Sequence, residues 1–304
     1  MSNIKYPETF EQCFNKFMNH VEKLNISPKT KYGYSQGVRK CTQLLLGKRM
    51  KILPYSVGDK EITFLKDVAF ENLEIRTKRW YLCMYNKFML FFDNLTMQKM
   101  GLSWPHDRRV HVDWLTADDA RKLVNYPMNL DQQMAIHLEL CMGLRRVEVI
   151  RLKVSNIYQD HIDVRGKGRY GGKWRSIPYS KDIPYIIERY NKKRNALIRE
   201  VKLINPAVIV PGELFIYRKG KELYSYGEKG SGFDAAYIHT VRDEIGFHFS
   251  NHTLRRTFGR TLWKNKVEIE KIAEIMGHES IDVTMKYIGV NMDDMSDAMN
   301  QLEF

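Results

Sequence analysis

The chain has 304 residues, a length that suggests two or three domains. Hydrophobic residues make up 43% of it and charged residues 28%, a balance that excludes a disordered chain. The formal net charge of +13 predicts an anionic partner, with nucleic acid as the first candidate and an anionic membrane surface as the second.

The first hundred residues predict a helical domain. Phe10, Phe14, Phe17 and Val21 recur at helical spacing and give the first helix its apolar face. A later helix is expected over residues 77–95, where aromatic side chains recur at the spacing of core positions.

Between these two helices, another is predicted to begin at Pro28. Ser27 suits the N-cap, and proline suits the first helical position, where no backbone N–H is needed. Tyr34 and Val38 give this helix an apolar face. Its other face is basic, and we expect the cationic side chains there to contact nucleic acid: Lys29, Lys31, Arg39 and Lys40.

Residues 101–113 are predicted to be a linker, because glycine, proline and charged residues interrupt the periodicity there. The next helix is predicted to begin after Thr116, with Asp119 three residues later in a pattern like a capping box. A strongly apolar helix over residues 132–142 follows and ends at Gly143.

The second half of the chain combines helices with a small β region. Residues 162–164 and 174–177 are strand-like and flank a glycine-rich loop. An irregular stretch is expected over residues 206–232. The other segments are predicted to be helical: 183–201, 234–245, 253–263, 269–276, 281–287 and a tail helix from Met292. The predicted fold class is therefore mainly α with a small antiparallel β-sheet (α+β).

Patterns for nucleotide and metal sites fail on their context. Residues 166–171 match G-x-G-x-x-G, but a dinucleotide fingerprint leads from a strand into a helix, and this loop leads into a second strand. Trp174 stands where a phosphate-binding P-loop needs serine or threonine. His248 and His252 lack the glutamate of a zinc protease motif, and the four cysteines are scattered. We therefore expect no cofactor, no metal and no disulfide framework.

The sequence also lacks the features of a membrane or secreted protein. It has no run of about 20 apolar residues, and its N-terminus has no apolar segment of the kind found in signal peptides. We expect neither a membrane span nor a signal peptide, and we expect a cytoplasmic protein with reduced cysteines.

Three separated segments gather side chains suited to a phosphate. They are residues 143–148 (G-L-R-R-V-E), residues 252–258 (H-T-L-R-R-T-F), and Gly277-His278 with Tyr287 nine residues later. His252 and Arg255 share a face near a predicted helix start, where free N–H groups already favour an anion. Gly277 is predicted to cap a helix in the left-handed conformation, which places His278 just past the helix end.

In this order and at this spacing, the three segments resemble the motifs of the tyrosine recombinases, the phage-integrase and Xer-type family. Residues 27–30 (S-P-K-T) and 115–116 (L-T) resemble the starts of a core-binding helix and of the catalytic domain in that family. The resemblance implies a DNA-clamping core-binding domain over residues 1–100 and a catalytic domain with a C-terminal tail helix over residues 114–304.

The resemblance also implies the catalytic side chains. They are two arginines, two histidines, a lysine and a nucleophilic tyrosine: Arg145, Arg255, His252, His278, Lys167 and Tyr287. Glu148 matches the family's acidic position and is expected to steady the site. The loop after Lys167 is longer than the usual family turn, so Lys173 remains an alternative to Lys167 as the catalytic lysine. Arg146 and Arg256 are expected to contact DNA.

These residue types suit the attack of a tyrosine on a DNA phosphodiester, which yields a 3′-phosphotyrosine and a free 5′-hydroxyl. Two guanidinium groups can bind the non-bridging oxygens bidentately. Only about one tyrosine in a thousand is ionised at pH 7, so the site must remove the phenolic proton during attack or stabilise the anion. His252 is placed to handle that proton. His278 is expected to donate a hydrogen bond to the phosphate, and a lysine to protonate the leaving oxygen.

The implied partners are double-stranded DNA and further copies of this chain, as a tetramer on synapsed DNA that can be a monomer in solution. The expected place of action is the nucleoid. The predicted tail helix carries an apolar stripe that either packs within the chain or docks on a neighbouring protomer: Met292, Met295, Met299 and Leu302.

Two other functions remain open from the sequence. A type IB topoisomerase-like or hairpin-forming strand-passing enzyme would use the same chemistry without a specific DNA site. A catalytically inactive DNA-binding protein is disfavoured, because every expected catalytic position is occupied.

Overall fold

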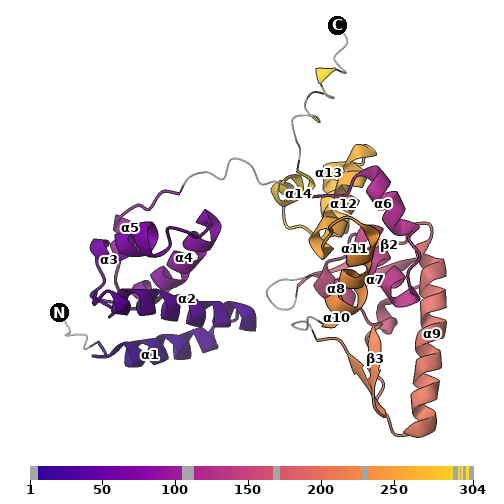
Figure 1. Cartoon of the computed structure of the whole chain (residues 1–304), viewed down its shortest axis with the longest axis horizontal. Helices are drawn as coiled ribbons and strands as arrows, with labels where there is room; N and C mark the ends of the chain where they lie inside the picture. The colour runs from indigo at the N-terminus through magenta and orange to yellow at the C-terminus, as the bar shows by residue number, and fades with distance from the viewer. Residues whose placement is uncertain are drawn as a thin grey trace. The chain divides into compact units, whose positions relative to one another are not determined.

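The computed structural model describes residues 6–104, 113–166, 172–227 and 232–289, together with positions 294, 296, 299 and 300. The chain divides into two compact units, Met1–Arg108 and Arg109–Phe304 (Figure 1). Each unit has its own hydrophobic core. Most of the predicted linker lies outside the described residues.

The N-terminal unit is helical, as the sequence predicts. Its helices are α1 (Phe10–Lys23), α2 (Pro28–Gly47), α3 (Asp59–Thr63), the wider helical turn η1 (Phe64–Ala69), α4 (Ile75–Phe91) and α5 (Thr96–Lys99). Ser27 caps α2 by accepting a hydrogen bond from the Thr30 backbone, which confirms the predicted helix start. The aromatic residues of α4 contribute to the core, where Tyr85 and Phe88 are fully buried.

Within the described residues, the C-terminal unit is mainly helical with two small antiparallel sheets. Its helices are α6 (Ala117–Val124), α7 (Leu130–Leu140), α8 (Arg146–Arg151), η2 (Val154–Asn156), α9 (Ile183–Ile204), α10 (Gly232–Asp234), η4 (Ala235–His239), α11 (Thr240–Ile245), α12 (Asn251–Lys264), α13 (Ile269–Met276) and α14 (Ile281–Ile288). Its strands are β1 (His161–Arg165), β2 (Trp174–Pro178), β3 (Ile216–Lys219) and β4 (Glu222–Ser225). The predicted fold class is confirmed.

The prediction of an irregular stretch over residues 206–232 was wrong, because this stretch contains the β3–β4 hairpin. Tyr217 pairs with Tyr224 across the two strands, and their rings stack with centroids 5.9 Å apart. Apolar side chains of the hairpin pack against Val201 near the end of the long helix α9. Figure 1 shows β3 beside this helix. Each strand has only four residues, too few for an alternating pattern to stand out among the lysines and glutamates around it.

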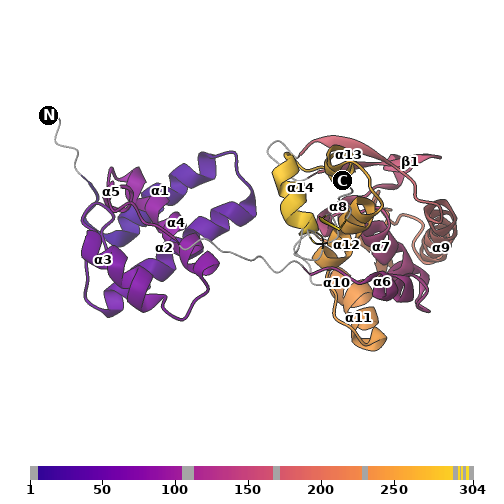
Figure 2. The ribbon, with the colours of Figure 1, turned by 90° about the horizontal axis from the view of Figure 1, so that it is seen from above.

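The packing of the C-terminal unit brings together the three motif segments. Helix α12 packs against α7, α13 and α14, and strand β2 packs against α13. Figure 2 shows α8, α12, α13 and α14 gathered in one region of this unit. Residues far apart in the sequence therefore meet where α8 and α12 begin and where α13 turns into α14.

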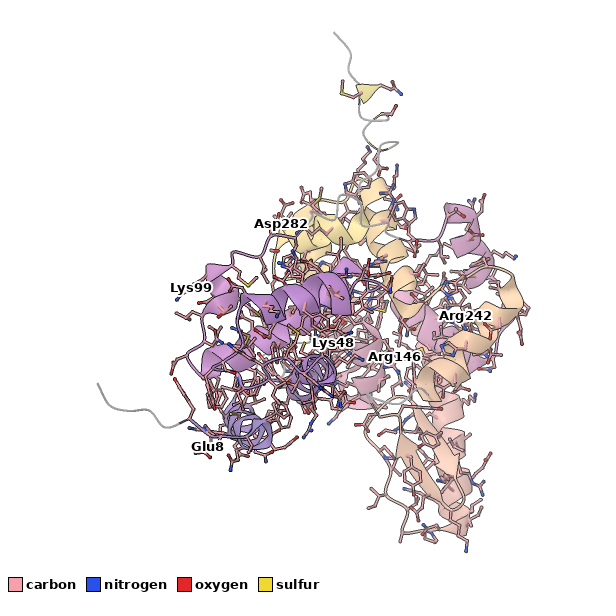
Figure 3. All side chains as sticks on the ribbon, turned by 60° about the vertical axis from the view of Figure 1, so that its left-hand side comes forward. Glu8, Lys48, Lys99, Arg146, Arg242 and Asp282 are labelled. Atoms are coloured by element: carbon pink, nitrogen blue, oxygen red, sulfur yellow. The ribbon has the colours of Figure 1, made fainter. Side chains whose placement is uncertain are left out.

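Basic side chains occur on both units, as Lys48 and Lys99 of the N-terminal unit and Arg146 and Arg242 of the C-terminal unit illustrate (Figure 3). None of the helices in the described ranges is both long enough and apolar enough to cross a membrane.

Candidate active site

A tight turn at residues 143–145 positions Arg145, the first of the two predicted catalytic arginines. Gly143 has a φ of +65°, and a Cβ at this position would lie 2.3 Å from Cδ1 of Phe258. Only glycine adopts this conformation here without strain and without a clash. The turn follows α7 and makes Arg145 the N-cap residue of α8. The Arg145 Nη2 then donates to the Gly277 carbonyl at 3.0 Å.

Glu148 is the buried acid that holds the arginines. Its carboxylate accepts the Arg145 backbone N–H at 2.8 Å and the Arg145 Nη1 at 2.9 Å. It also accepts two bonds from Arg175, at 2.9 and 2.8 Å, and the Arg255 Nη1 lies 3.7 Å from its Oε2. Burial alone would raise the pKa of Glu148, but the hydrogen bonds and charges of these arginines outweigh burial and lower it to about 2. One carboxylate thus faces three guanidinium groups, and the site keeps a net positive charge.

Arg255 is almost completely buried, with a relative exposure of 1%. Ser250 caps α12 by accepting a hydrogen bond from the Thr253 backbone, and this places Arg255 in the early part of the helix. Its guanidinium donates Nη1 to the Gly143 carbonyl and Nη2 to the Met276 carbonyl. Burial lowers the pKa of Arg255 to about 9, so the group remains cationic at neutral pH.

His278 follows Gly277, whose φ of +60° ends α13 as predicted. The His278 Nε2 lies 3.2 Å from the Arg255 Nη2, and its Nδ1 lies 2.8 Å from the Thr284 Oγ1. Because a guanidinium only donates, Nε2 must accept, and Nδ1 carries the ring proton. Burial and the charge of Arg255 lower the pKa of His278 to about 3, so the ring is neutral. In this arrangement Nε2 is an acceptor, and the predicted hydrogen bond from His278 to a phosphate stays a prediction.

Tyr287 lies on α14 beside His252 and two arginines. Its Oη is 3.1 Å from the His252 Nδ1, and its ring packs edge-on against His278 with centroids 5.2 Å apart. The guanidinium carbons of Arg255 and Arg256 lie 5.7 and 5.4 Å from the ring centre. Burial raises the pKa of Tyr287, and the charges of the two arginines offset only part of the rise. The phenol is therefore protonated at neutral pH and needs a neighbouring base to become a nucleophile.

Five of the six predicted catalytic residues gather in this cluster: Arg145, His252, Arg255, His278 and Tyr287. Lys167 lies outside the described residues. Lys173 is exposed directly before β2, and its carbonyl accepts the Gly166 N–H at 2.9 Å. Lys173 therefore stands at the base of the hairpin whose loop contains Lys167.

The four basic residues predicted to bind DNA in the N-terminal unit fall into two groups. Lys31 donates to Glu22 at 2.8 Å, and Arg39 lies 3.4 Å from Glu11. The other two are exposed: Lys29 and Lys40. Ion pairs at a surface contribute little to stability, so a phosphate can replace the carboxylate beside Arg39 at low cost.

The two basic residues that follow the catalytic arginines lie in different surroundings. The Arg146 Nε donates to Asp234 at 2.6 Å, and the Asn251 side-chain amide donates to the same carboxylate oxygen at 2.9 Å. This arrangement ties α8 to the end of α10 and to the start of α12. Arg256 instead lies beside Tyr287.

Sequence reasoning missed two charged residues near the site. Arg175 bonds to Glu148, and its side chain is only 10% exposed. Its position two residues before the buried Ile177, on the same face of β2, was an available signal. Glu139 is fully buried on α7, and among the described residues neither of its carboxyl oxygens has a hydrogen-bond partner. The available signal for Glu139 was an acidic residue among the apolar side chains at the end of α7.

Among the residues that the structure describes, no cluster of three or more His, Cys, Asp or Glu side chains has the arrangement of a metal site.

The sequence of this chain is similar to those of known recombinases. Residues 113–294 match the profile of the phage integrase family. The tyrosine recombinase XerA of Pyrococcus horikoshii is 27% identical over 214 residues, which cover 69% of this chain and 68% of that protein. A XerD tyrosine recombinase of Listeria innocua is 25% identical over 62% of this chain and 61% of that protein. A tyrosine recombinase of Thermosipho africanus is 25% identical over 96% of this chain and 98% of that protein.

The fold is similar to those of solved integrases and recombinases. An integrase of the transposon Tn1549, in complex with a circular intermediate DNA, has a TM-score of 0.67 at 17% identity, covering 96% of this chain and 98% of that one. The XerH site-specific recombinase, in a post-cleavage complex with palindromic difH substrate, has a TM-score of 0.66 at 15% identity, covering 96% of this chain and 84% of that one. At these identities the likeness concerns the fold.

Proposed function

The chain belongs to the phage integrase family, the tyrosine recombinases, and we propose that it is a site-specific DNA recombinase that uses Tyr287 as its nucleophile. The observation that carries this proposal is the 3.1 Å contact between the Tyr287 Oη and the His252 Nδ1, beside the guanidinium groups of Arg255 and Arg256. A phenol beside a base and two cations is suited to attack a phosphodiester.

Cleavage begins when the Tyr287 Oη attacks the phosphorus atom. The bond from Oη to phosphorus forms, the bond from phosphorus to the 5′-oxygen breaks, and the phenolic proton passes to the His252 Nδ1. Arg145 and Arg255 bind the non-bridging oxygens, whose negative charge grows in the transition state. Glu148 holds Arg145 by two hydrogen bonds, so that this guanidinium is oriented before DNA arrives.

The leaving 5′-oxygen takes a proton from a lysine of the β1–β2 hairpin. Lys167 is the first candidate, and Lys173 at the base of the hairpin is the alternative. Rejoining reverses the step: a 5′-hydroxyl from a partner duplex attacks the phosphotyrosine, and Tyr287 regains its proton. The number of phosphoester bonds is conserved, so the cycle needs no nucleotide cofactor as an energy source.

Lys167 and Lys173 can be separated with a substrate whose scissile 5′-bridging oxygen is replaced by sulfur. A thiolate leaves without protonation, because its conjugate acid has a pKa far below that of an alcohol. We expect Lys167→Ala to slow cleavage of the oxygen substrate but not of the sulfur substrate, and Lys173→Ala to leave both nearly unchanged. The reverse pattern would assign the proton to Lys173.

We infer that the working assembly is a tetramer on two DNA sites. Exchange between two duplexes requires four strand cleavages, and each chain offers one Tyr287, so four copies complete one reaction. Double-stranded DNA is the substrate, and the expected place of action is the nucleoid.

The proposal is tested with a nicked duplex that traps the covalent intermediate. The wild-type chain should form a protein–DNA adduct that survives denaturation, and Tyr287→Phe should bind the duplex without forming it. Failure of the wild-type chain to form an adduct on any duplex from its own genome would contradict the proposal.

A topoisomerase-like activity is the rival that shares this chemistry. Supercoiled plasmids with and without a captured target site distinguish the two functions. We expect recombinant products that depend on the site. Efficient relaxation of every plasmid without recombinant products would favour the rival.

A further inference from the structure

We propose that Arg175 is a positioning residue for the reaction, a role that rests on the proposed function. By binding Glu148 and the end of α13 together, it aims Arg145 and Arg255 at the phosphate. It also holds His278 in place beside them.

Arg175 connects three elements of the site. From β2, its Nη1 and Nη2 donate to the two carboxylate oxygens of Glu148 on α8, at 2.9 and 2.8 Å. Its Nε donates to the Ile275 carbonyl at 2.8 Å, in the last turn of α13. Two residues beyond that carbonyl, the chain turns at Gly277 to present His278.

Gly277 leaves the space that Arg175 occupies. A Cβ at Gly277 would lie 2.9 Å from the Arg175 Nη1 and 3.1 Å from its Cζ. The guanidinium therefore packs directly on the backbone of the turn that leads to His278. This contact makes the position of the turn depend on the position of Arg175.

The hydrogen-bonding capacity of Glu148 explains what this contact does for catalysis. A carboxylate offers about four lone-pair directions. Two accept from Arg145 and two from Arg175, which leaves the Arg255 Nη1 at 3.7 Å, outside hydrogen-bond distance. Without Arg175, two acceptor sites open, and Arg255 can turn into them and away from the phosphate.

Arg175 also connects the site to the hairpin that contains Lys167. The first residue after β1, Gly166, has its Cα hydrogens against this ion pair: a Cβ there would lie 4.0 Å from both the Arg175 Nη1 and the Glu148 Oε1. The base of the loop therefore rests on the Glu148–Arg175 pair. A shift of this pair would displace Gly166 and the turn at His278 together.

The role requires an arginine. A guanidinium forms two parallel bonds to one carboxylate and keeps its Nε for a third acceptor, whereas a lysine ammonium is a single point of charge. Arg175→Lys should keep the charge and lose the paired geometry.

The test compares Arg175→Gln with Arg218→Gln, a matched control. Arg218 is an exposed strand arginine on β3, whose Nε donates to the Gly220 carbonyl at 2.8 Å, away from Glu148. Affinity is measured by gel shift, and single-turnover adduct formation is followed on the nicked duplex between pH 4 and 8. We expect Arg175→Gln to bind DNA like the control and to cleave about 10²-fold more slowly.

The pH profile separates positioning from a general loss of structure. The charged and titratable groups that face Glu148 are Arg145 at the start of α8, Arg175 on β2, Arg255 on α12 and His278 after α13. Removing Arg175 takes away the strongest of the contacts that keep Glu148 ionised. We therefore expect cleavage by Arg175→Gln to fall further as the pH drops toward 4, with no such added fall in the control.

Each outcome of this experiment decides the proposal. An adduct rate and pH profile for Arg175→Gln equal to those of the control would overturn it, and so would a parallel loss of DNA binding, which would make Arg175 a DNA contact. If Arg175→Gln does not fold, Arg175→Lys replaces it, and a wild-type rate for that variant would overturn the proposal. A wild-type chain that forms no adduct would instead contradict the proposed function.

Discussion

Arg145 and Arg255 share the buried carboxylate of Glu148 but are held in different ways. Arg145 bonds to it directly, whereas Arg255 is fixed by two backbone carbonyls. Their substitution by alanine removes donors that act on the transition state, and each should slow cleavage by at least about 10²–10³-fold. DNA affinity should change little, because many other cationic groups supply it. Gel shift and single-turnover cleavage measure the two effects, and equal losses of binding and cleavage would contradict this division.

Glu139 predicts a pH dependence of stability. Burial and the negative charge of Asp234 raise the pKa of Glu139 well above its ordinary value, so the folded chain keeps this carboxyl protonated where the unfolded chain has released the proton. As the pH rises above about 4.5, the free energy of unfolding should fall by about 1.4 kcal/mol per pH unit at this site until the folded group also ionises. Glu139→Gln removes this loss. The variant should therefore be more stable than the wild-type chain, by a margin larger at pH 8 than at pH 5.

Urea unfolding at several pH values measures that margin. Glu200→Gln on the surface of α9 is the matched control, and it should show no margin that grows with pH. A margin for Glu139→Gln that shrinks as the pH rises would show that the buried carboxyl is ionised and stabilised by Arg146 and Arg255 instead.

For single residues, the sequence was sufficient to predict the functional ones that belong to recognisable motifs. The order and spacing of the motifs, through their resemblance to those of the tyrosine recombinases, were enough to name Tyr287 and His252, which the fold brings to 3.1 Å. They were not enough to find Arg175 or the buried Glu139, because the importance of these two residues comes from what lies across from them in space. The tautomer of His278 likewise depends on Arg255 and Thr284, from two other parts of the chain.

Among the secondary-structure elements, the turn between α7 and α8 depends most on one residue. Gly143→Ala places a methyl group against the Phe258 ring and forces alanine to a φ of +65°. We expect a loss of about 1–3 kcal/mol in the free energy of unfolding from the backbone alone, with more from the clash, and slower cleavage because Arg145 moves.

Gly246→Ala separates the two causes, since this residue has a φ of +89° with nothing within 4 Å of the added Cβ. It should carry the backbone strain without the clash and leave cleavage unchanged. Thermal unfolding and the nicked-duplex assay measure both variants, and an equal effect of the two substitutions would show that Phe258 does not constrain the turn.

Helices with caps and a long apolar face were predictable, and short elements were not. Ser27, Thr116 and Ser280 each cap a helix where the sequence places one. The β3–β4 hairpin and the short helices α3 and α5 lack enough residues to show a period, and they depend on packing against longer neighbours.

For the whole molecule, the charge of +13 predicts DNA binding that depends strongly on salt. A protein that neutralises six or more phosphates should lose at least about 10³-fold in affinity between 50 and 200 mM salt. Fluorescence anisotropy with a labelled duplex measures this slope. A flat response would argue against extensive contact with the DNA backbone.

The contacts of Tyr287 predict that each protomer cleaves with its own tyrosine. The phenol touches His252 and lies over the guanidinium groups of the same chain. A mixture of Tyr287→Phe with Arg255→Ala should therefore form no adduct, because neither protomer has a complete set of catalytic residues. Recovery of the adduct in the mixture would show that the tyrosine is delivered to a neighbouring protomer.

The central claim is that the Tyr287 Oη becomes esterified to the 3′-phosphate of a cleaved DNA strand. The most direct measurement is tandem mass spectrometry of the adduct after nuclease and protease digestion. We predict a residual nucleotide phosphate on the peptide that contains Tyr287, and a free 5′-hydroxyl on the released strand. A phosphate attached to any other residue, or a 5′-phosphate linked to the protein, would contradict the account.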